Sequence, residues 1–267
     1  ASAAMVAEYI DAAARHRVRL HVVDSSADFR YPTAAGYEAV YGHAHGAPEL
    51  LSHFAQGVPE HVQEAGKAHV GHPGCFATAA LLAAVPLCTS TCQPGSLFIN
   101  GITGSTGSGR SPLPGTHHPE RHSNLYAYKP LAHRHAPEIA ACIANAGGGE
   151  QQVNFVPHSG PFARGIHITL QAEMAAPVDA AELLAHYRSY YAASPFVRVI
   201  AGTPRIKDVV TSNYSHIGVA VQGNTVVVMS AIDNLVKGAA GGAVQWMNRL
   251  WELPEDSGLL ASAPAWT

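Results

Sequence analysis

The segment His72-Pro73-Gly74-Cys75 places a cysteine directly after a tight turn, and a run of helix-compatible residues follows it. A proline and a glycine before such a run predict a helix that begins near the cysteine. Unpaired N–H groups and the positive end of the helix macrodipole there favour the thiolate, which is the nucleophilic form. Cys75 is therefore a candidate nucleophile, although a small buried residue is the more ordinary role of a single cysteine.

A nucleophilic cysteine at a helix start is compatible with three reaction classes: acyl transfer or hydrolysis, thiol redox chemistry, and thioester-mediated aldehyde chemistry. Thiol redox chemistry favours a Cys-x-x-Cys arrangement, which the sequence lacks. Hydrolysis requires a base and an oxyanion hole but no nicotinamide. The residues alone leave the first and third classes open.

Five segments together resemble the N-acetyl-gamma-glutamyl-phosphate reductases of arginine biosynthesis and the related aminoadipyl-phosphate reductases of lysine biosynthesis. The first is the active-site segment His72-Pro73-Gly74-Cys75-Phe76-Ala77-Thr78. The others follow the family's order: Asp24-Ser25-Ser26-Ala27-Asp28-Phe29-Arg30, His133-Arg134-His135-Ala136-Pro137-Glu138-Ile139, Pro157-His158 with Arg164-Gly165, and Ala231-Ile232-Asp233-Asn234-Leu235-Val236-Lys237-Gly238.

This resemblance implies an NADP(H)-dependent enzyme in which Cys75 attacks an acyl phosphate, N-acetyl-glutamyl 5-phosphate, and phosphate leaves. Hydride from NADPH then reduces the thioester, and the thiohemiacetal collapses to a semialdehyde. A proton donor and acceptor must lie beside the sulfur, and histidine suits this task because its pKa lies near neutrality. His133 matches the family's catalytic histidine, whereas most of the 17 histidines must be structural or exposed.

The same resemblance implies ligand-binding residues. For the substrate they are Arg30, Arg110, Arg134, Glu138, His158 and Arg164, and for the cofactor Ser25, Gly104, Ser105 and Asn234. Arginine is suited to bidentate capture of phosphate or carboxylate, and Arg164 is the strongest substrate candidate. Glu138 is expected to orient a histidine or to bind the substrate amide. Asn234 is expected to face the nicotinamide, or to cap the following helix.

Glycines are frequent in residues 101–110, but this run is not a P-loop. It lacks the Gly-Lys-Ser/Thr ending, and Pro112 and Pro114 follow in place of a helix. A flexible loop is the local prediction. The family resemblance implies a loop that lines the active site, where backbone N–H groups would meet an anion.

Residues 115–135 are crowded with histidine and basic side chains. His117, His118 and His122 could hold zinc in principle, but no acidic or cysteine ligand lies at the usual spacing. A cationic wall that faces a phosphorylated or carboxylated substrate explains the composition better, and no metal site is expected.

The composition indicates a globular protein without a membrane span, since 47% of the 267 residues are hydrophobic but no long apolar run occurs. The net charge of −3 argues against a nucleic-acid surface. Four cysteines without a disulfide-scaffold spacing favour a reducing cytoplasm, and Cys88 and Cys92 are interpreted as structural.

Hydrophobic periodicity predicts the elements around these residues. Helices are expected at 3–17, from 75 to a stop at Pro86, at 180–191 with an Asp179 cap, and at 236–250. Strands are expected at 18–24, 96–100 and 196–200. A hairpin is expected at 218–230, and a long strand over 153–174 is expected to be broken by a turn at 157–161. Residues 31–71 are expected to form an irregular connector with short helical pieces, such as 48–54.

The predicted fold class is α/β plus α+β: a remnant of a Rossmann-type nucleotide-binding domain, then an α+β domain of the aspartate-semialdehyde or glyceraldehyde-phosphate dehydrogenase type. The expected division is residues 1–72 for the NADP-binding part, 73–233 for catalysis and dimerisation, and 234–267 for a helix returning to the first part. Because a helix comes first with no strand before it, the chain is expected to lack its first βαβ unit and to bind cofactor weakly.

Several alternatives remain open from the sequence. An aminoadipyl-phosphate reductase would act on a substrate linked to a small acidic carrier protein. A thioester hydrolase would need no cofactor, and a non-catalytic fragment would keep only the fold. In each enzymatic case a homodimer or homotetramer is expected.

Overall fold

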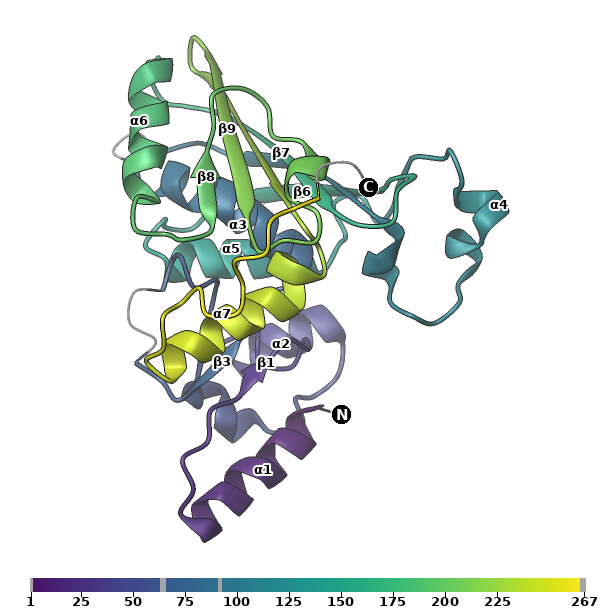
Figure 1. Cartoon of the computed structure of the whole chain (residues 1–267), viewed down its shortest axis with the longest axis vertical. Coiled ribbons are helices and arrows are strands. Elements are labelled where there is room, and N and C mark those ends of the chain that lie inside the picture. Colours follow the sequence, from purple (N-terminus) through teal and green to yellow (C-terminus); the bar gives the residue numbers. More distant parts are fainter. Residues whose placement is uncertain (1, 63–65, 91–92, 265–267) are drawn as a thin grey trace.

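The computed structural model describes residues 2–62, 66–90 and 93–264 and contains two β-sheets with one long helix between them (Figure 1). A three-stranded sheet and its helices form the lower part of the view, and a seven-stranded sheet forms the upper part. The C-terminal helix α7 (Gly241–Leu250) crosses between them. The prediction of an α/β part followed by an α+β part is confirmed.

The smaller sheet is parallel, with the strand order β1-β3-β2. Its elements are α1 (Ser2–His16), β1 (Val23–Asp24), α2 (Ala34–Tyr41), the 3₁₀ helix η1 (Pro48–His53), β2 (Phe54–Gln56) and β3 (His69–Gly71). The irregular connector expected over 31–71 is wrong for strands β2 and β3 and for α2, whereas the short helical piece expected at 48–54 is confirmed by η1. Both missed strands have three residues, all buried, so they show no alternation of polar and apolar residues.

The larger sheet is mixed, with the strand order β5-β6-β4-β7-β10-β9-β8. Its strands are β4 (Leu97–Thr103), β5 (Tyr126–Ala127), β6 (Val153–Ser159), β7 (Ile166–Glu173), β8 (Val197–Val199), β9 (Ser215–Gln222) and β10 (Thr225–Ile232). The remaining elements are α3 (Cys75–Cys88), η2 (Ser105–Ser108), η3 (Pro114–Thr116), α4 (His118–Arg121), α5 (His135–Asn145), α6 (Ala180–Tyr190), η4 (Ile206–Asp208) and the π-helical turn η5 (Val236–Ala240).

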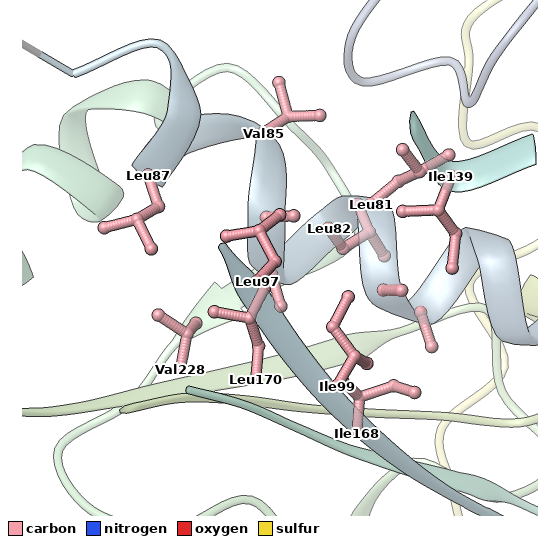
Figure 2. Close-up of a cluster of buried hydrophobic side chains, with 14 of the residues drawn as sticks. Leu81, Leu82, Val85, Leu87, Leu97, Ile99, Ile139, Ile168, Leu170 and Val228 are labelled. Carbon is pink, nitrogen blue, oxygen red and sulfur yellow. The ribbon is translucent and has the colours of Figure 1, made fainter. Parts of the chain in front are cut away.

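Helix α3 lies in the centre of the main hydrophobic core, where every residue from Phe76 to Cys88 is buried (Figure 2). Leu81 of this helix lies beside Ile139 of α5, and Ile99 of β4 and Ile168 of β7 belong to the same core below the helix in this view. A helix that is apolar all round is buried all round. The residue at its first position, Cys75, is therefore carried on a rigid element.

Helix α3 continues past Pro86 to Cys88, so the predicted stop at Pro86 is wrong. Proline has no N–H and leaves the carbonyl four residues earlier without its helical donor. Here the Tyr191 hydroxyl donates to the Leu82 carbonyl at 2.7 Å, and the Tyr187 hydroxyl donates to the Ala83 carbonyl at 2.6 Å. Tertiary donors from α6 thus satisfy the carbonyls near the proline.

Residues 153–174 form two strands that are not neighbours, because β4 lies between β6 and β7. The expected turn at 157–161 is misplaced, since β6 includes Pro157. The Pro157 carbonyl accepts from the Tyr128 N–H on the side of the two-residue edge strand β5. The missing N–H of Pro157 faces this same edge, where a proline is tolerated.

Other predictions are confirmed with small shifts. Helices α1 and α6, strand β8 and the β9–β10 hairpin lie where the sequence places them, and Asp179 accepts from the N–H groups of Ala181 and Glu182. The strand expected at 18–24 is limited to Val23–Asp24, and the one expected at 96–100 extends to Thr103. Cys88 is buried, whereas Cys92 lies outside the described residues.

The larger sheet has one face under helices and one open face. In β4, Leu97 and Ile99 point into the core, while Phe98 between them is 55% exposed. Helices α3, α5 and α6 contact the strands of this sheet. In the part of the chain that the structure describes, no helix is both long and apolar enough to cross a membrane.

Candidate active site

The turn before Cys75 is held by two buried charged side chains. Arg30 donates to the carbonyls of His72 at 3.1 Å and Ser25 at 2.8 Å, and its Nη1 lies 3.5 Å from Glu138 Oε2. Glu138 Oε1 accepts from the Gly74 N–H at 2.7 Å. Arg30 and Glu138 therefore fix the backbone at the start of helix α3.

Cys75 is the first residue of helix α3, as predicted, but burial raises the pKa of its thiol. The Phe76 N–H and the Arg30 charge act in the opposite direction and do not overcome burial. The expectation that the helix start holds Cys75 ionised is therefore wrong. The sulfur is protonated at neutral pH, and a base must remove this proton before attack.

His133 lies close to the nucleophile's helix, where its ring centroid is 6.2 Å from that of Phe76 and 5.6 Å from that of Tyr128. Burial, helped by the charges of Arg134 and Lys129, lowers the pKa of His133 to about 4. The imidazole is neutral at pH 7 and can accept a proton. Its Nδ1 accepts from the His135 N–H at 3.3 Å, so the neutral ring carries its own proton on Nε2 and can take a second proton only on Nδ1.

Two cavities meet at Gly107. The smaller, about 200 Å³, is lined by Cys75 together with residues that include Ser25, His72, Asn234 and Gly238. The larger, about 750 Å³, is lined by His133 together with residues that include Tyr128, Lys129 and Arg134. The candidate nucleophile and the candidate base therefore face two adjoining compartments.

Asn234 joins three loops at the smaller cavity. Its Oδ1 accepts from the Gly165 N–H at 2.7 Å, and its Nδ2 donates to Thr106 Oγ1 at 3.0 Å. It is not the helix cap that was considered as its ordinary role. Asp233 Oδ1 accepts from the N–H groups of Leu235 and Val236, each at 2.8 Å, and performs that function.

Arg164 is committed to Asp233. Its Nε and Nη2 donate to the two carboxylate oxygens, each at 3.0 Å. Burial would raise the pKa of Asp233, but these bonds and those from the N–H groups of Thr211, Val236 and Leu235 hold it below its usual value. In this geometry Arg164 braces the loop that carries Asn234.

Backbone N–H groups of the glycine-rich loop have partners within the protein. Gly104, Ser105 and Thr106 donate to the carbonyls of Gly165, Phe162 and Ala163. The expectation that these amides meet an anion is therefore wrong for these three, because the loop pairs with the turn at 162–165. Thr106 and Gly107 still line the Cys75 cavity.

Only two of the remaining candidates line these compartments, one in each. Ser25 lines the Cys75 cavity, and Arg134 lines the His133 cavity. Arg110 is exposed and lines neither of them, and half-buried His158 lies in strand β6. Glu138 is fully buried, and its Oε2 lies 3.8 Å from His135 Nε2 without a hydrogen bond, so its role in orienting a histidine stays a prediction.

Sequence reasoning missed several residues of these compartments: His72, Thr106, Gly107, Tyr128 and Gly238. A signal existed for two of them. His72 and Gly238 stand inside the matched segments, but the turn made His72 look remote and Gly238 looked like a packing residue. The sequence does not mark Tyr128 as a site residue, because only the folded chain places its ring 5.6 Å from that of His133.

The basic segment 115–135 does not act as one wall. Arg121 is buried, and its guanidinium donates to Ser159 Oγ and to the Gly160 carbonyl, so it anchors the projecting arm that contains α4 (Figure 1). His117, His118 and His122 are exposed on this arm. Only the end of the segment, with Lys129, His133 and Arg134, lines a cavity. Over residues 2–62, 66–90 and 93–264, no three metal-ligating side chains gather.

Comparison with known proteins agrees with this geometry. Residues 75–234 match the family model described as semialdehyde dehydrogenase, dimerisation domain. The fold is similar to aspartate semialdehyde dehydrogenase II from Vibrio cholerae, with a TM-score of 0.67 at 17% identity, over 94% of this chain and 77% of that one. The fold and the matched domain thus define a chain of the semialdehyde dehydrogenase class.

Curated relatives are more specific. The chain is 42% identical over 247 residues to N-acetyl-gamma-glutamyl-phosphate reductase of Pelotomaculum thermopropionicum. The aligned region covers 89% of this chain and 71% of that protein. It is 40% identical over 243 residues to the enzyme of the same name from Methanopyrus kandleri, with 89% and 70% covered. The chain belongs to the N-acetyl-gamma-glutamyl-phosphate reductase family. Membership confirms the resemblance of the five segments and implies a nicotinamide cofactor.

Proposed function

We propose that this chain catalyses the NADPH-dependent reduction of N-acetyl-glutamyl 5-phosphate to the semialdehyde through a thioester on Cys75, in arginine biosynthesis. One observation carries the proposal: the Cys75 cavity and the larger, basic His133 cavity meet at Gly107. A thiol in one of two connected compartments can receive an acyl group from the neighbouring compartment and a reductant within its own.

His133 serves as the base in this proposal. A raised thiol pKa and a lowered imidazole pKa place the proton on sulfur at rest, with a neutral acceptor available. As Cys75 Sγ attacks the acyl carbon, the proton passes to His133, the carbon–oxygen bond to phosphate breaks, and inorganic phosphate leaves. The imidazolium formed can return a proton to the oxygen of the thiohemiacetal in the later step.

Lys129 and Arg134 are proposed to hold the anionic ends of the substrate. Both residues line the His133 cavity, and both are exposed toward it. Arginine binds phosphate or carboxylate in bidentate fashion, and lysine adds a point charge. Arg164, engaged with Asp233, is proposed to support the site through that carboxylate.

The Cys75 cavity fits a nicotinamide. It is small, and the buried ring nitrogens of His72 have no partner among the described residues. Asn234, Ser25 and Gly238 would hold the amide and one face of the ring. When bound, NADPH supplies the hydride. The chain's own task is to keep Cys75 beside that ring and to exclude water through the backbone of Gly238.

We further propose that two copies pair through the open face of the larger sheet. Its exposed Phe98 and the matched dimerisation domain support this, and a tetramer of two such dimers is compatible with it. The proposed division remains 1–72, 73–233 and 234–267, with an NADP-binding, a catalytic and a returning segment, and the match over 75–234 supports it. The cytoplasm is the proposed location.

The test runs the reaction in reverse, with N-acetyl-glutamate semialdehyde, NADP⁺ and inorganic phosphate, and follows NADPH formation. Phosphate-dependent NADPH formation is expected. Acyl release without NADP⁺ would favour the hydrolase, and turnover only of a carrier-linked aminoadipyl substrate would favour the lysine-pathway enzyme. No reaction in a folded protein that binds NADP⁺ would contradict the proposal.

A further inference from the structure

A π-helical turn, η5, lies directly against the nucleophile. The N–H groups of Gly238 and Ala240 donate to the carbonyls of Asp233 and Leu235, each at 3.0 Å and five residues earlier in the chain. A methyl group on Gly238 would lie 2.8 Å from Cβ of Cys75. Such turns are rare and are frequent at functional sites. The backbone of Gly238 thus forms a wall on one side of the half-buried Cys75.

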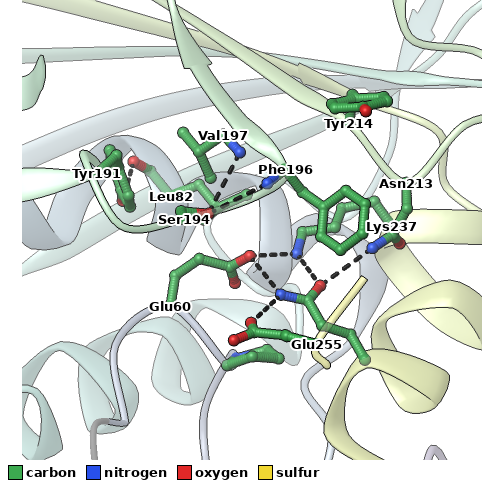
Figure 3. A network of polar contacts seen from close by, with 12 residues as sticks. Glu60, Leu82, Tyr191, Ser194, Phe196, Val197, Asn213, Tyr214, Lys237 and Glu255 are labelled. Carbon is green, nitrogen blue, oxygen red and sulfur yellow. Dashed lines mark hydrogen bonds and ion pairs between the residues drawn. The ribbon is translucent and has the colours of Figure 1, made fainter. Parts of the chain in front are cut away.

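Lys237, next to this wall, is fully buried with its ammonium group paired (Figure 3). Its Nζ donates to Glu60 Oε1 at 2.5 Å and to Gln245 Oε1 at 2.6 Å. Burial alone would raise the pKa of Glu60, but the Lys237 charge and the hydrogen bonds from Lys237 and Gln245 hold it below its usual value. Both groups are therefore charged within the protein interior.

Gln245 of α7 connects this pair to the rest of the fold. Its Nε2 donates to Glu60 Oε1 at 2.9 Å and to Glu255 Oε1 at 2.6 Å, and its Oε1 also accepts from Asn213 Nδ2 at 3.0 Å. Figure 3 shows these contacts converging below Phe196, whose ring centroid lies 5.7 Å from Lys237 Nζ. The network joins the segment after β2, the loop before β9 and the C-terminal helix.

Several contacts of Lys237, Glu60 and Gln245 together hold the turn η5 in one position. A buried charge without its partner is strongly unfavourable, so Lys237 Nζ must stay beside Glu60. Gly238 is the next residue and has little freedom to leave Cys75. The polar network therefore acts on the nucleophile without touching it.

We propose that Lys237 and Glu60 are positioning residues, whose buried ion pair fixes the π-helical turn so that Gly238 stays packed against Cys75. The effect on turnover rests on the proposed function, whereas the effect on thiol reactivity does not. A network that only stabilises the fold would not change the reactivity of Cys75 in the folded state.

The primary test measures iodoacetamide labelling of Cys75 at pH 7, by mass spectrometry of its peptide, in the wild type and in Lys237→Met. Loss of the wall exposes the half-buried sulfur further and lowers its pKa, so the labelling rate is expected to rise about tenfold, which corresponds to one pKa unit. The reductase kcat is expected to fall by at least about tenfold with little change in KM. A labelling rate within about twofold of wild type would overturn the proposal, whether or not the chain is active.

The double variant Glu60→Gln/Lys237→Met removes both charges and folds even if Lys237→Met alone does not, since no unpaired charge is buried. Its unfolding free energy is expected to recover toward wild type while Cys75 labelling stays fast. If the unfolding free energy and the slow labelling of Cys75 both returned to wild-type values, the ion pair would contribute only charge balance, which would refute the positioning role. Val226→Ala, at the far end of β10, is the matched core control, and equally fast labelling in that variant would also refute it.

Discussion

Arg164 holds both carboxylate oxygens of Asp233 at 3.0 Å, and the same carboxylate accepts three backbone N–H groups. The sequence predicts Arg164 as a substrate ligand, whereas this pairing gives it a structural role. The guanidinium side chain is one-third exposed, but two of its donors are used inside the protein. Its first role is to fix the residue before Asn234.

Asp233→Asn is expected to destabilise the fold at pH 7 by roughly 1–3 kcal/mol, because the partly exposed Arg164 and three backbone N–H groups lose the buried carboxylate that accepts from them. The folded-state pKa of Asp233 is depressed, so its stabilisation is present above the ordinary value of 3.8 and is lost as the pH falls below it. Urea unfolding at pH 7 and pH 3 measures both effects. Asp208→Asn, in the exposed pair with Arg205, is the control and should change stability by less than about 0.5 kcal/mol.

Cys75→Ser is expected to lower kcat by at least about a thousandfold while leaving the thermal unfolding midpoint nearly unchanged, since the hydroxyl is a far weaker nucleophile. Steady-state NADPH formation and circular dichroism measure the two. Cys142→Ala, at a buried thiol away from both compartments, should keep kcat within a few-fold. Residual activity in Cys75→Ser close to that of the wild type would contradict the thioester.

His133→Gln is expected to reduce kcat about 10²- to 10⁴-fold, because the base that takes the thiol proton is lost. The wild type should lose activity as the pH falls through the His133 pKa of about 4, since the protonated imidazole cannot accept the proton. In the variant this acid limb should disappear, and kcat should rise with pH through the raised pKa of Cys75. An unchanged pH profile would exclude His133 as the base. His122→Gln on the exposed arm is the control.

Arg134→Ala is expected to raise KM for the acyl substrate by about 10- to 100-fold with a smaller change in kcat, because a charge-assisted contact to the anion is removed. The matched variant Arg110→Ala should have KM within about twofold of wild type, since Arg110 lines neither cavity. Initial-rate kinetics at constant ionic strength compare them. A larger rise in KM for Arg110→Ala than for Arg134→Ala would indicate that the anion binds at the glycine-rich loop instead.

Phe98→Glu is expected to convert the proposed dimer into monomers, because it buries an acidic group in the proposed contact on the open sheet face. Light scattering after size-exclusion chromatography gives the mass. Leu113→Glu, an exposed apolar residue on the projecting arm, tests whether any new surface charge has this effect. A Phe98→Glu protein with wild-type mass would rule out this face as the contact.

Most of the fold could be predicted from the sequence where periodicity is strong. Helices α1 and α6 and the β9–β10 hairpin were evident from apolar spacing and turn residues. Strands β2 and β3 were not, because three buried residues in a parallel sheet carry no alternation. The continuation of α3 past Pro86 was not either, because its donors come from residues a hundred positions later.

The site was predictable in part. Motif position placed Cys75 at a helix start, but its protonation depends on how completely Gly238 and the core bury it, and a linear sequence does not express burial. The ion pairs of Arg30 with Glu138 and of Arg164 with Asp233 likewise join distant segments. Residue type indicated charge, but only the fold showed which charges are already paired.

The two tyrosine hydroxyls that complete α3 have a consequence for biosynthesis of the chain. Leu82 and Ala83 emerge from the ribosome long before Tyr191 and Tyr187, so the last turn of the nucleophile's helix lacks these donors until α6 has been translated and docks. Contacts across such a separation form late. Maturation of the Cys75 helix is thus coupled to synthesis of the downstream half, and a nascent chain arrested before residue 187 holds an unfinished catalytic element.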